Sequence, residues 1–298
     1  MSTELKEHHL KLVLLSPKGP LYRHDGGIFR KSLRAAPLTL TTLAALVPED
    51  LDIEIRLIDE GIEPVPTDLK ADMVAMTVIT GSAMRAYELA RCFRQTGICV
   101  VLGGPHVTLM PDEASQHADA IVTGYAEATW PQLLRDFVQR DLKPRYDMAF
   151  DFRLRDYPVQ ARRDLLKGKG YSTIHTFEAT RGCVHDCEFC VVPSAWGRVP
   201  FQKDIAHVVD DIRQSGAKRL VFYDLNLIAN RQYAKELFEA LEPLKVKWFG
   251  LATTLIDDDM AERMARSGCR GLLIGFESVS TLHLEISGKV FNRPALYG

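Results

Sequence analysis

Short apolar segments alternate with amphipathic ones along the first 140 residues, and this alternation restricts the fold more than any other feature of the sequence. Five segments have the composition of buried or half-buried strands: 11–17, 53–61, 72–82, 98–106 and 120–125. Helical spacing occurs between and after them, at 36–48, 83–97 and 130–139. Strands separated by helices need crossover connections, which give a parallel sheet covered on both faces. We therefore predict a doubly wound, flavodoxin-like α/β domain over residues 1–140.

The alternation stops at residues 141–170 and then resumes. This stretch mixes charged, aromatic and turn residues without a sustained period, and we interpret it as an inter-domain linker. Strand signals then return at 172–182, 219–226, 246–254 and 270–278, separated by helical segments at 203–215, 231–242 and 257–267. The sequence thus predicts a second parallel α/β domain over residues 171–298, with about four strands.

Three of the six cysteines lie close together in the segment TRGCVHDCEFC. Cys183, Cys187 and Cys190 follow the first strand of the second domain, where β/α barrels place their chemistry. A structural zinc site needs four ligands, usually as two pairs, and the sequence has no second pair. An iron–sulfur cube takes one thiolate per iron, so three cysteines would leave one iron open. Zinc and three buried thiols on one helix face remain the alternatives.

The segment EATRGCVHDCEFC resembles the signature loop of radical S-adenosylmethionine (SAM) enzymes. The resemblance implies that Cys183, Cys187 and Cys190 hold a 4Fe–4S cluster, whose open iron is chelated by the amine and carboxylate of SAM. It also implies one-electron cleavage of the sulfonium, which gives a 5′-deoxyadenosyl radical that abstracts a substrate hydrogen. By the same resemblance, Phe189 lies near the adenine.

Two later strand ends extend the resemblance to the cobalamin-linked members. In FYDLNLIAN, Asp224 and Asn226 take the places of an Asp-Asn pair that approaches the methionyl amine, and Leu225 replaces an acidic residue often found there. A carboxylate beside an ammonium group would form a charge-assisted bond. In IGFESVS, the resemblance implies that Glu277 and Ser278 face the ribose and methionyl groups. An ordinary polar strand end is the alternative for both segments.

The loops after the strands of the first domain are candidate ligand contacts. Doubly wound sheets bind ligands outside the carboxyl ends of their strands, and glycine there lets the backbone approach a flat ligand. The candidates are Thr80, Gly81, Ser82, Gly103, Gly104, Pro105, His106, Gly124 and Tyr125. Glycine also ends many strands for structural reasons, and that alternative stays open. No G-x-G-x-x-G follows the first strand, which disfavours a dinucleotide.

A module of this kind in front of a radical SAM loop resembles the cobalamin-binding domain of class B radical methylases, and the resemblance covers most of the chain. The D-x-H-x-x-G pattern that supplies a lower axial histidine in some cobalamin modules is absent. We therefore infer cobalamin bound without a histidine ligand, with His106 as an ordinary loop histidine. Radical methylthiotransferases are disfavoured because Cys92 and Cys99 look like small buried hydrophobic residues and not like cluster ligands.

The resemblance implies transfer of a methyl group from SAM, by way of cobalamin, to an unactivated carbon of a small-molecule or lipid-like substrate, as in hopanoid methylases. A flavodoxin or ferredoxin would donate electrons. The alternatives are a cobalamin-linked cyclase or ring-rearranging enzyme, and a truncated cofactor-binding protein without activity. The truncated protein is an alternative because the family's catalytic domain usually has six strands, whereas about four are predicted here. We accordingly expect either a shortened chain or a partner that covers an open barrel edge.

Composition excludes several other classes. The formal net charge of −2 gives no electrostatic footprint for nucleic acid. The sequence has no apolar stretch near the ~18 residues of a membrane span, and its first apolar run is too short for a secretory signal. We expect a cytoplasmic protein, whose thiols stay reduced.

Overall fold

The computed structural model describes residues 9–19 and 35–292. The chain divides into two compact units. The first consists of Met1–Phe152 and Val159–Ile174, and the second of Arg153–Pro158 and His175–Gly298.

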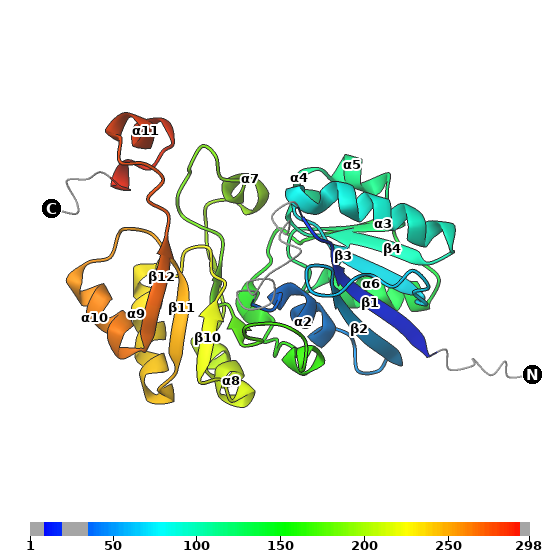
Figure 1. Ribbon diagram of the computed structural model, residues 1–298, viewed down its shortest axis with the longest axis horizontal. Helices are drawn as coiled ribbons and strands as arrows, with labels where there is room; N and C mark the ends of the chain where they lie inside the picture. The colour runs from blue at the N-terminus through cyan, green and yellow to red at the C-terminus, as the bar shows by residue number, and fades with distance from the viewer. Residues whose placement is uncertain (1–8, 20–34, 293–298) are drawn as a thin grey trace, which may run out of the picture. The chain divides into compact units, whose positions relative to one another are not determined.

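A six-stranded parallel sheet in the order β2-β1-β3-β4-β5-β6 forms the centre of the first unit (Figure 1). The strands are β1 (Leu10–Ser16), β2 (Ile53–Asp59), β3 (Met73–Thr77), β4 (Cys99–Gly103), β5 (Ala120–Thr123) and β6 (Arg145–Asp147). The helices are α2 (Leu38–Ala45), α3 (Ala83–Gln95), α4 (Pro105–Leu109), α5 (Pro111–Ser115) and α6 (Thr129–Val138), with 3-10 turns η2 (Thr80–Ser82) and η4 (Arg163–Leu166). The strand order reverses direction at β1, so the predicted doubly wound, flavodoxin-like sheet is confirmed.

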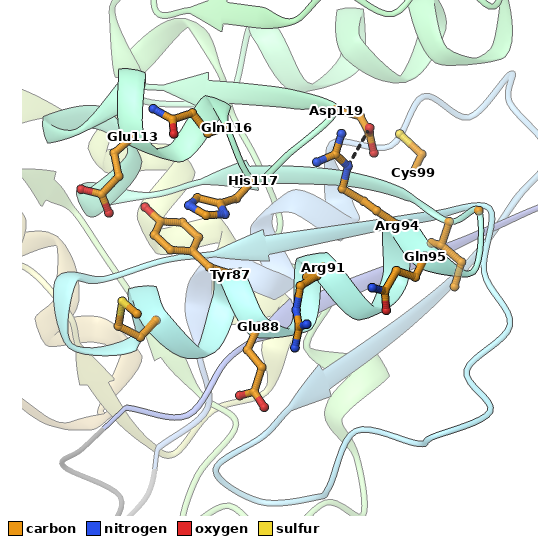
Figure 2. Close-up of a pocket in the computed structure, with 13 residues that line it drawn as sticks. Tyr87, Glu88, Arg91, Arg94, Gln95, Cys99, Glu113, Gln116, His117 and Asp119 are labelled. Carbon is orange, nitrogen blue, oxygen red and sulfur yellow. Dashed lines mark hydrogen bonds and ion pairs between the residues drawn. The ribbon is translucent and has the colours of Figure 1, made fainter.

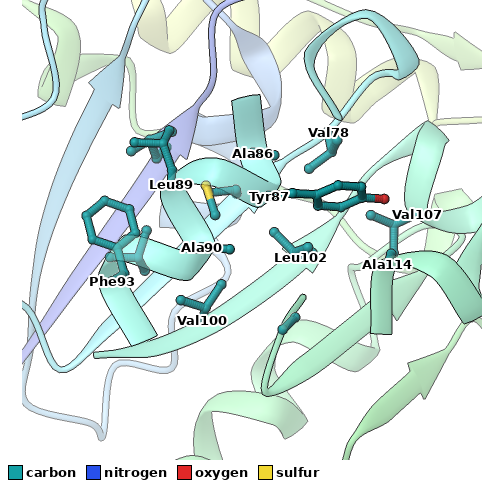
Figure 3. Packing of buried hydrophobic residues seen from close by; sticks show 14 of the residues in the cluster. Val78, Ala86, Tyr87, Leu89, Ala90, Phe93, Val100, Leu102, Val107 and Ala114 are labelled. Atoms are coloured by element: carbon teal, nitrogen blue, oxygen red, sulfur yellow. The ribbon is translucent and has the colours of Figure 1, made fainter. Parts of the chain in front are cut away.

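Both faces of this sheet are buried, which explains the continuous apolar runs in its strands. Successive residues of β1 enter different cores, since Val13 packs with α3 and Leu14 packs with α2 and α6. On the α3 face, Ala90 and Phe93 lie over Val100 of β4 (Figure 3). A strand covered on both sides gains stability from every side chain, so it needs no polar alternation.

Much of the stretch interpreted as a linker is ordered against the first unit. Strand β6 pairs with β5, and its central residue Tyr146 is buried with its hydroxyl bonded to Asp136 at 2.8 Å. Further along, Lys169 Nζ donates to the Leu57 carbonyl at 2.6 Å, and Tyr171 donates to Asp59 at 3.1 Å. A single buried residue between exposed neighbours gives no periodic signal, which explains why the sixth strand was not expected.

The second unit contains a four-stranded parallel sheet in the order β12-β11-β10-β7 and a two-stranded antiparallel ribbon, β8-β9. The strands are β7 (Thr176–Phe177), β8 (Thr180–Arg181), β9 (Phe201–Gln202), β10 (Arg219–Phe222), β11 (Lys247–Ala252) and β12 (Cys269–Ile274). The helices are α7 (Val192–Trp196), α8 (Ile205–Ser215), α9 (Arg231–Leu241), α10 (Asp258–Arg266) and α11 (Thr281–Ile286), with 3-10 turns η3 (Leu154–Asp156), η5 (Glu242–Leu244) and η6 (Val290–Asn292). The second parallel α/β unit is therefore confirmed.

One face of this sheet carries the core. Trp248 stacks on Phe238 with ring centroids 5.4 Å apart, and its indole N–H donates to Ser267 Oγ at 3.0 Å. The opposite face presents Phe249 and Leu273, which are 47% and 69% exposed. None of the helices in the described part of the chain combines the length and apolar character needed to cross a bilayer.

The strand expected over residues 172–182 is interrupted in the structure. Only β7 and β8 form there, and the N–H groups of Ala179, which precedes β8, and of Thr180, its first residue, turn toward the carboxylate of Asp224. Because those donors bond a side chain from the end of β10, they cannot continue a sheet ladder. The interruption lies immediately before the cysteine segment.

Candidate functional site

The three clustered cysteines lie in a loop between β8 and α7 (Figure 1). Cys187 is buried, whereas Cys183 and Cys190 are partly exposed. Gly182 precedes them with a φ of +90°, a left-handed conformation that redirects the chain out of β8. Since α7 begins only at Val192, the three thiols do not share a helix face, and that alternative is excluded.

The donor set fits an iron–sulfur cluster better than a single ion. Burial raises the pKa of the Cys187 thiol, Lys289 opposes this rise, and Cys190 and Cys183 add to it. The three thiols are thus near enough to interact electrostatically. Across residues 9–19 and 35–292, however, no three His, Cys, Asp or Glu side chains are placed to hold one metal ion. A structural zinc site needs four ligands on one ion, whereas a 4Fe–4S cluster takes each thiolate on a different iron.

Asn226 connects the end of β10 to the cysteine loop. It is 1% exposed, and its Nδ2 atom lies 3.8 Å from Cys183 Sγ. Its Oδ1 atom is buried and has no hydrogen-bond partner among the described residues. An unpaired buried acceptor costs roughly 1–3 kcal/mol and calls for an explanation. A ligand with a hydrogen-bond donor, bound beside Cys183, would provide one.

Asp224, two residues earlier, has a different environment. Its carboxylate is 1% exposed and accepts hydrogen bonds from Ala179 N at 3.1 Å, Thr180 N at 2.5 Å and Thr180 Oγ1 at 2.9 Å. Burial and the neighbouring charge of Glu178 raise the pKa of Asp224 to about 7. Its acceptor atoms therefore face donors of the protein.

The structure brings Phe189 and Glu277 together through Lys289, which the sequence analysis missed. Lys289 Nζ lies 5.5 Å from the centre of the Phe189 ring and 2.6 Å from Glu277 Oε1. Glu277 has a φ of 62°, an uncommon conformation for a residue with a side chain. The Ser278 side chain bonds within its own segment, since its Oγ accepts a hydrogen bond from Ser280 N at 3.0 Å. A basic residue after an acidic strand end was the only available signal for Lys289.

A second missed residue is Thr253, which directly follows β11. Its hydroxyl oxygen is buried and has no hydrogen-bond partner in the part of the chain that the structure describes. It lies at the same carboxyl edge of the sheet as Asn226, because β10 and β11 are parallel neighbours. A polar residue directly after an apolar strand was the signal that could have indicated it.

In the first unit, His106 is held by protein partners at both ring nitrogens. Its Nε2 lies 3.0 Å from the Tyr87 hydroxyl and its Nδ1 lies 3.3 Å from Thr80 Oγ1. The ring is buried, so neither nitrogen is presented as a free axial ligand. Of the neighbouring predicted contacts, Gly81 is exposed, whereas Ser82 is buried with its hydroxyl on the Ile79 carbonyl.

Two of the predicted glycine contacts are sites of close packing. A Cβ atom on Gly104 would lie 2.9 Å from both the N and O atoms of Val78, and one on Gly124 would lie 2.5 Å from Met148 Cβ. The space beside Gly124 is thus filled by Met148, which follows β6. Gly103, Pro105 and Tyr125 are partly exposed at the same edge. As cobalamin contacts, all the predicted loop residues stay predictions.

A cavity of about 1040 Å³ opens between α3 and α5 (Figure 2). On its wall, the rings of Tyr87 and His117 stack with their centroids 3.9 Å apart. Arg94 Nε donates a hydrogen bond to Asp119 Oδ1 at 3.1 Å. Its lining includes Cys99, at the amino end of β4, and none of the predicted cobalamin contacts. Ligands of doubly wound sheets bind at the opposite strand ends, so this cavity is not the expected crevice.

Two family models match the chain. Residues 34–134 match the B12 binding domain, and residues 177–295 match the radical SAM superfamily. Bacteriochlorophyllide d C-8(2)-methyltransferase of Chlorobaculum tepidum is 34% identical over 280 residues, which cover 85% of this chain and 60% of that protein. The C-12(1)-methyltransferase of the same organism is 30% identical over 273 residues, covering 86% and 59%. The chain thus spans about 60% of the length of these relatives.

Two further matches are more distant. Hopanoid C-2 methylase of Rhodopseudomonas palustris is 26% identical over 224 residues, covering 71% of this chain and 40% of that protein. The solved structure of TsrM, a radical SAM methyltransferase from Kitasatospora setae with cobalamin and a 4Fe–4S cluster bound, aligns with a TM-score of 0.68 and 17% identity. The alignment covers 92% of this chain and 60% of TsrM, and it shows a shared fold.

Proposed function

The chain is a radical SAM protein with a B12-binding domain, and from this premise we propose that it is a cobalamin-dependent methyltransferase acting on an unactivated carbon. The observation that carries the proposal is the unpaired Oδ1 atom of Asn226 beside a loop of three cysteines that follows a parallel strand. The radical SAM domain implies a 4Fe–4S cluster and SAM, and the B12-binding domain implies cobalamin. When bound, these groups supply the electron that cleaves SAM and the carrier of the methyl group, while the protein orients them.

In the second unit, Cys183, Cys187 and Cys190 would hold three irons and leave the fourth open. The Oδ1 atom of Asn226 would accept a hydrogen bond from the methionyl ammonium, which resolves its unpaired state. Phe189 would lie along the adenine. The Glu277 and Ser278 segment would face the ribose and methionyl groups, with Lys289 bonded to Glu277.

In the first unit, the exposed residues Thr80 and Gly81 and the partly exposed residues Gly103, Pro105 and Tyr125 would contact cobalamin. Gly104 and Gly124 would keep the loops close enough to form that surface, and His106 would hold Thr80 in place. His106 would not be a ligand of cobalt, because both of its ring nitrogens have protein partners.

The substrate we infer is a polycyclic, largely apolar small molecule. This rests on the names of the relatives, which act on bacteriochlorophyllides and hopanoids. A flavodoxin or ferredoxin would deliver the electron. A cytoplasmic location would keep the cysteine loop reduced before the cluster is inserted.

Electron paramagnetic resonance of the anaerobically reconstituted, reduced protein tests the proposal. A cluster signal that shifts when SAM is added supports an open iron. Release of 5′-deoxyadenosine together with S-adenosylhomocysteine and a methylated chlorophyllide or hopanoid, dependent on added cobalamin, then supports methyl transfer to that substrate class. A protein that assembles no cluster, or one whose signal ignores SAM, would contradict the proposal.

A further inference from the structure

We propose that Asp224 is a positioning residue that holds the entrance to the cysteine loop, and that it is not a ligand of SAM. The inference rests on the proposed function, because it assumes that the loop carries a cluster. The family resemblance places both Asp224 and Asn226 near the methionyl ammonium. We assign the contact with that group to Asn226 and not to Asp224.

The hydrogen bonds that Asp224 accepts from the protein are the first observation behind this proposal. Ala179 N lies 3.1 Å from both carboxylate oxygens, and Thr180 contributes its N–H at 2.5 Å and its hydroxyl at 2.9 Å. Oδ1 therefore accepts three of these contacts, Oδ2 shares the Ala179 N–H, and the residue is 1% exposed. An ammonium group bound at Oδ2 would pull the carboxylate away from the Ala179 and Thr180 donors that fix it, and each displaced N–H would then lack a partner.

The same short segment is held from two other elements. The Ala179 carbonyl accepts from Tyr233 Oη of α9 at 3.2 Å and from Lys203 N, just after β9, at 2.9 Å. Beside it, Glu178 pairs with Arg181 at 2.5 Å and with Lys203 at 3.0 Å. Residues 178–181 are thus fixed by side chains and backbone that converge from β10, α9 and the end of β9.

The position of this segment connects it to the cluster site. Gly182 alone separates Arg181 from Cys183, so any displacement of residues 178–181 moves the first cysteine. Three thiolates hold a cluster only when their spacing is maintained, and a supporting contact can therefore control affinity without touching the metal. Asn226 differs in this respect, because its Oδ1 atom has no partner among the described residues and can accept a donor at no cost to the fold.

Substituting Asp224 and Asn226 one at a time separates positioning of the cysteine loop from binding of SAM. Asp224→Asn puts an amide N–H against the backbone donors, so we expect cluster iron and acid-labile sulfide to fall by about threefold or more during anaerobic gel filtration. The SAM dissociation constant per assembled cluster, from titration of the resonance shift, should stay within about twofold of the unsubstituted protein. Asn226→Ala should show the reverse, with full iron content and SAM affinity about tenfold weaker. An Asp224→Asn protein with full iron and about tenfold weaker SAM affinity would overturn the inference.

If Asp224→Asn fails to fold, two substitutions of Thr180 give a milder test of the same contact. Thr180→Val removes only the hydroxyl contact with Asp224, and Thr180→Ser keeps it. We expect Thr180→Val to lose iron faster than Thr180→Ser at unchanged SAM affinity, and equal retention in the two would overturn the positioning role. If the unsubstituted protein assembles no cluster, the proposed function fails as well, whereas the outcomes above overturn this inference alone.

Discussion

The Nδ2 atom of Asn226 lies 3.8 Å from Cys183 Sγ, so this amide is placed to influence a cluster held by that thiolate. Asn226→Asp would replace a weak N–H donor with a negative charge. Both changes disfavour adding an electron, and we expect the cluster reduction potential to fall by roughly 50–100 mV. A spectroelectrochemical titration measures this, with Gln232→Glu on the surface of α9 as the matched change of charge. Equal potentials in the two variants would contradict the placement of Asn226.

Replacing the loop cysteines singly tests their shared role. Cys183→Ala, Cys187→Ala or Cys190→Ala should each remove most of the iron and sulfide of the reconstituted protein, because a cube cannot close with two protein ligands. Cys92→Ala is the matched control, since Cys92 lies on α3 in the other unit and is exposed, so the prediction that it is buried was wrong. Loss of iron in the control, or its retention in any of the three loop variants, would show that the ligands are assigned incorrectly.

The sequence predicted the first unit well because the strands β1, β3, β4 and β5 are buried on both faces and give continuous apolar runs. It missed β6, where only Tyr146 is buried between exposed neighbours. The break between β7 and β8 could not be predicted, because it depends on Asp224, which lies 44 residues beyond Thr180 in the chain. The spacing of the cysteines indicated the cluster loop directly. Lys289 and Thr253 reach their places only through the tertiary fold, and a charged or polar residue after a strand was too common a local signal to single out either one.

Replacing each of two glycines in the left-handed conformation by alanine should lower the stability of the fold by different amounts. A Cβ on Gly268, where φ is +96°, would lie 1.9 Å from the Val246 carbonyl oxygen, whereas one on Gly216, where φ is +66°, would meet nothing within 4 Å. Gly216→Ala should therefore cost about 1 kcal/mol of unfolding free energy from conformation alone. Gly268→Ala adds a clash with backbone and should cost more than about 3 kcal/mol. Urea unfolding followed by tryptophan fluorescence compares them, and similar midpoints would contradict the packing described here.

His106 provides a test of how cobalt is bound. Because its two ring nitrogens face Tyr87 and Thr80, the resonance spectrum of bound cobalt(II) should show no splitting from a nitrogen of His106. His106→Phe should leave that spectrum unchanged and weaken cobalamin binding through loss of the contact with Thr80. His117→Phe preserves the stack on Tyr87 and is the control. Nitrogen splitting that disappears in His106→Phe would make the histidine a ligand and refute the arrangement.

Glu178 should give the second unit a stability that depends on pH. Burial alone would raise its pKa, but Arg181 and Lys203 outweigh burial and lower the pKa from 4.5 to about 2. A carboxyl whose pKa is lower in the folded state stabilises the fold above its unfolded pKa, and it loses that contribution as the pH falls toward the folded value. The difference in unfolding free energy between the unsubstituted protein and Glu178→Gln should therefore be about 3 kcal/mol at neutral pH.

The same difference should shrink between about pH 4.5 and pH 2, where Glu178 becomes protonated in both states. Urea unfolding of both proteins at about pH 7 and about pH 3, at fixed ionic strength, measures the two values. The matched control is Glu236→Gln, which removes an exposed carboxyl from α9 and should give a small difference at either pH. If the cost of Glu178→Gln were the same at both pH values, the carboxylate would not be the charged partner of Arg181 and Lys203. The ion pairs would then contribute nothing to holding residues 178–181 in front of the cysteine loop.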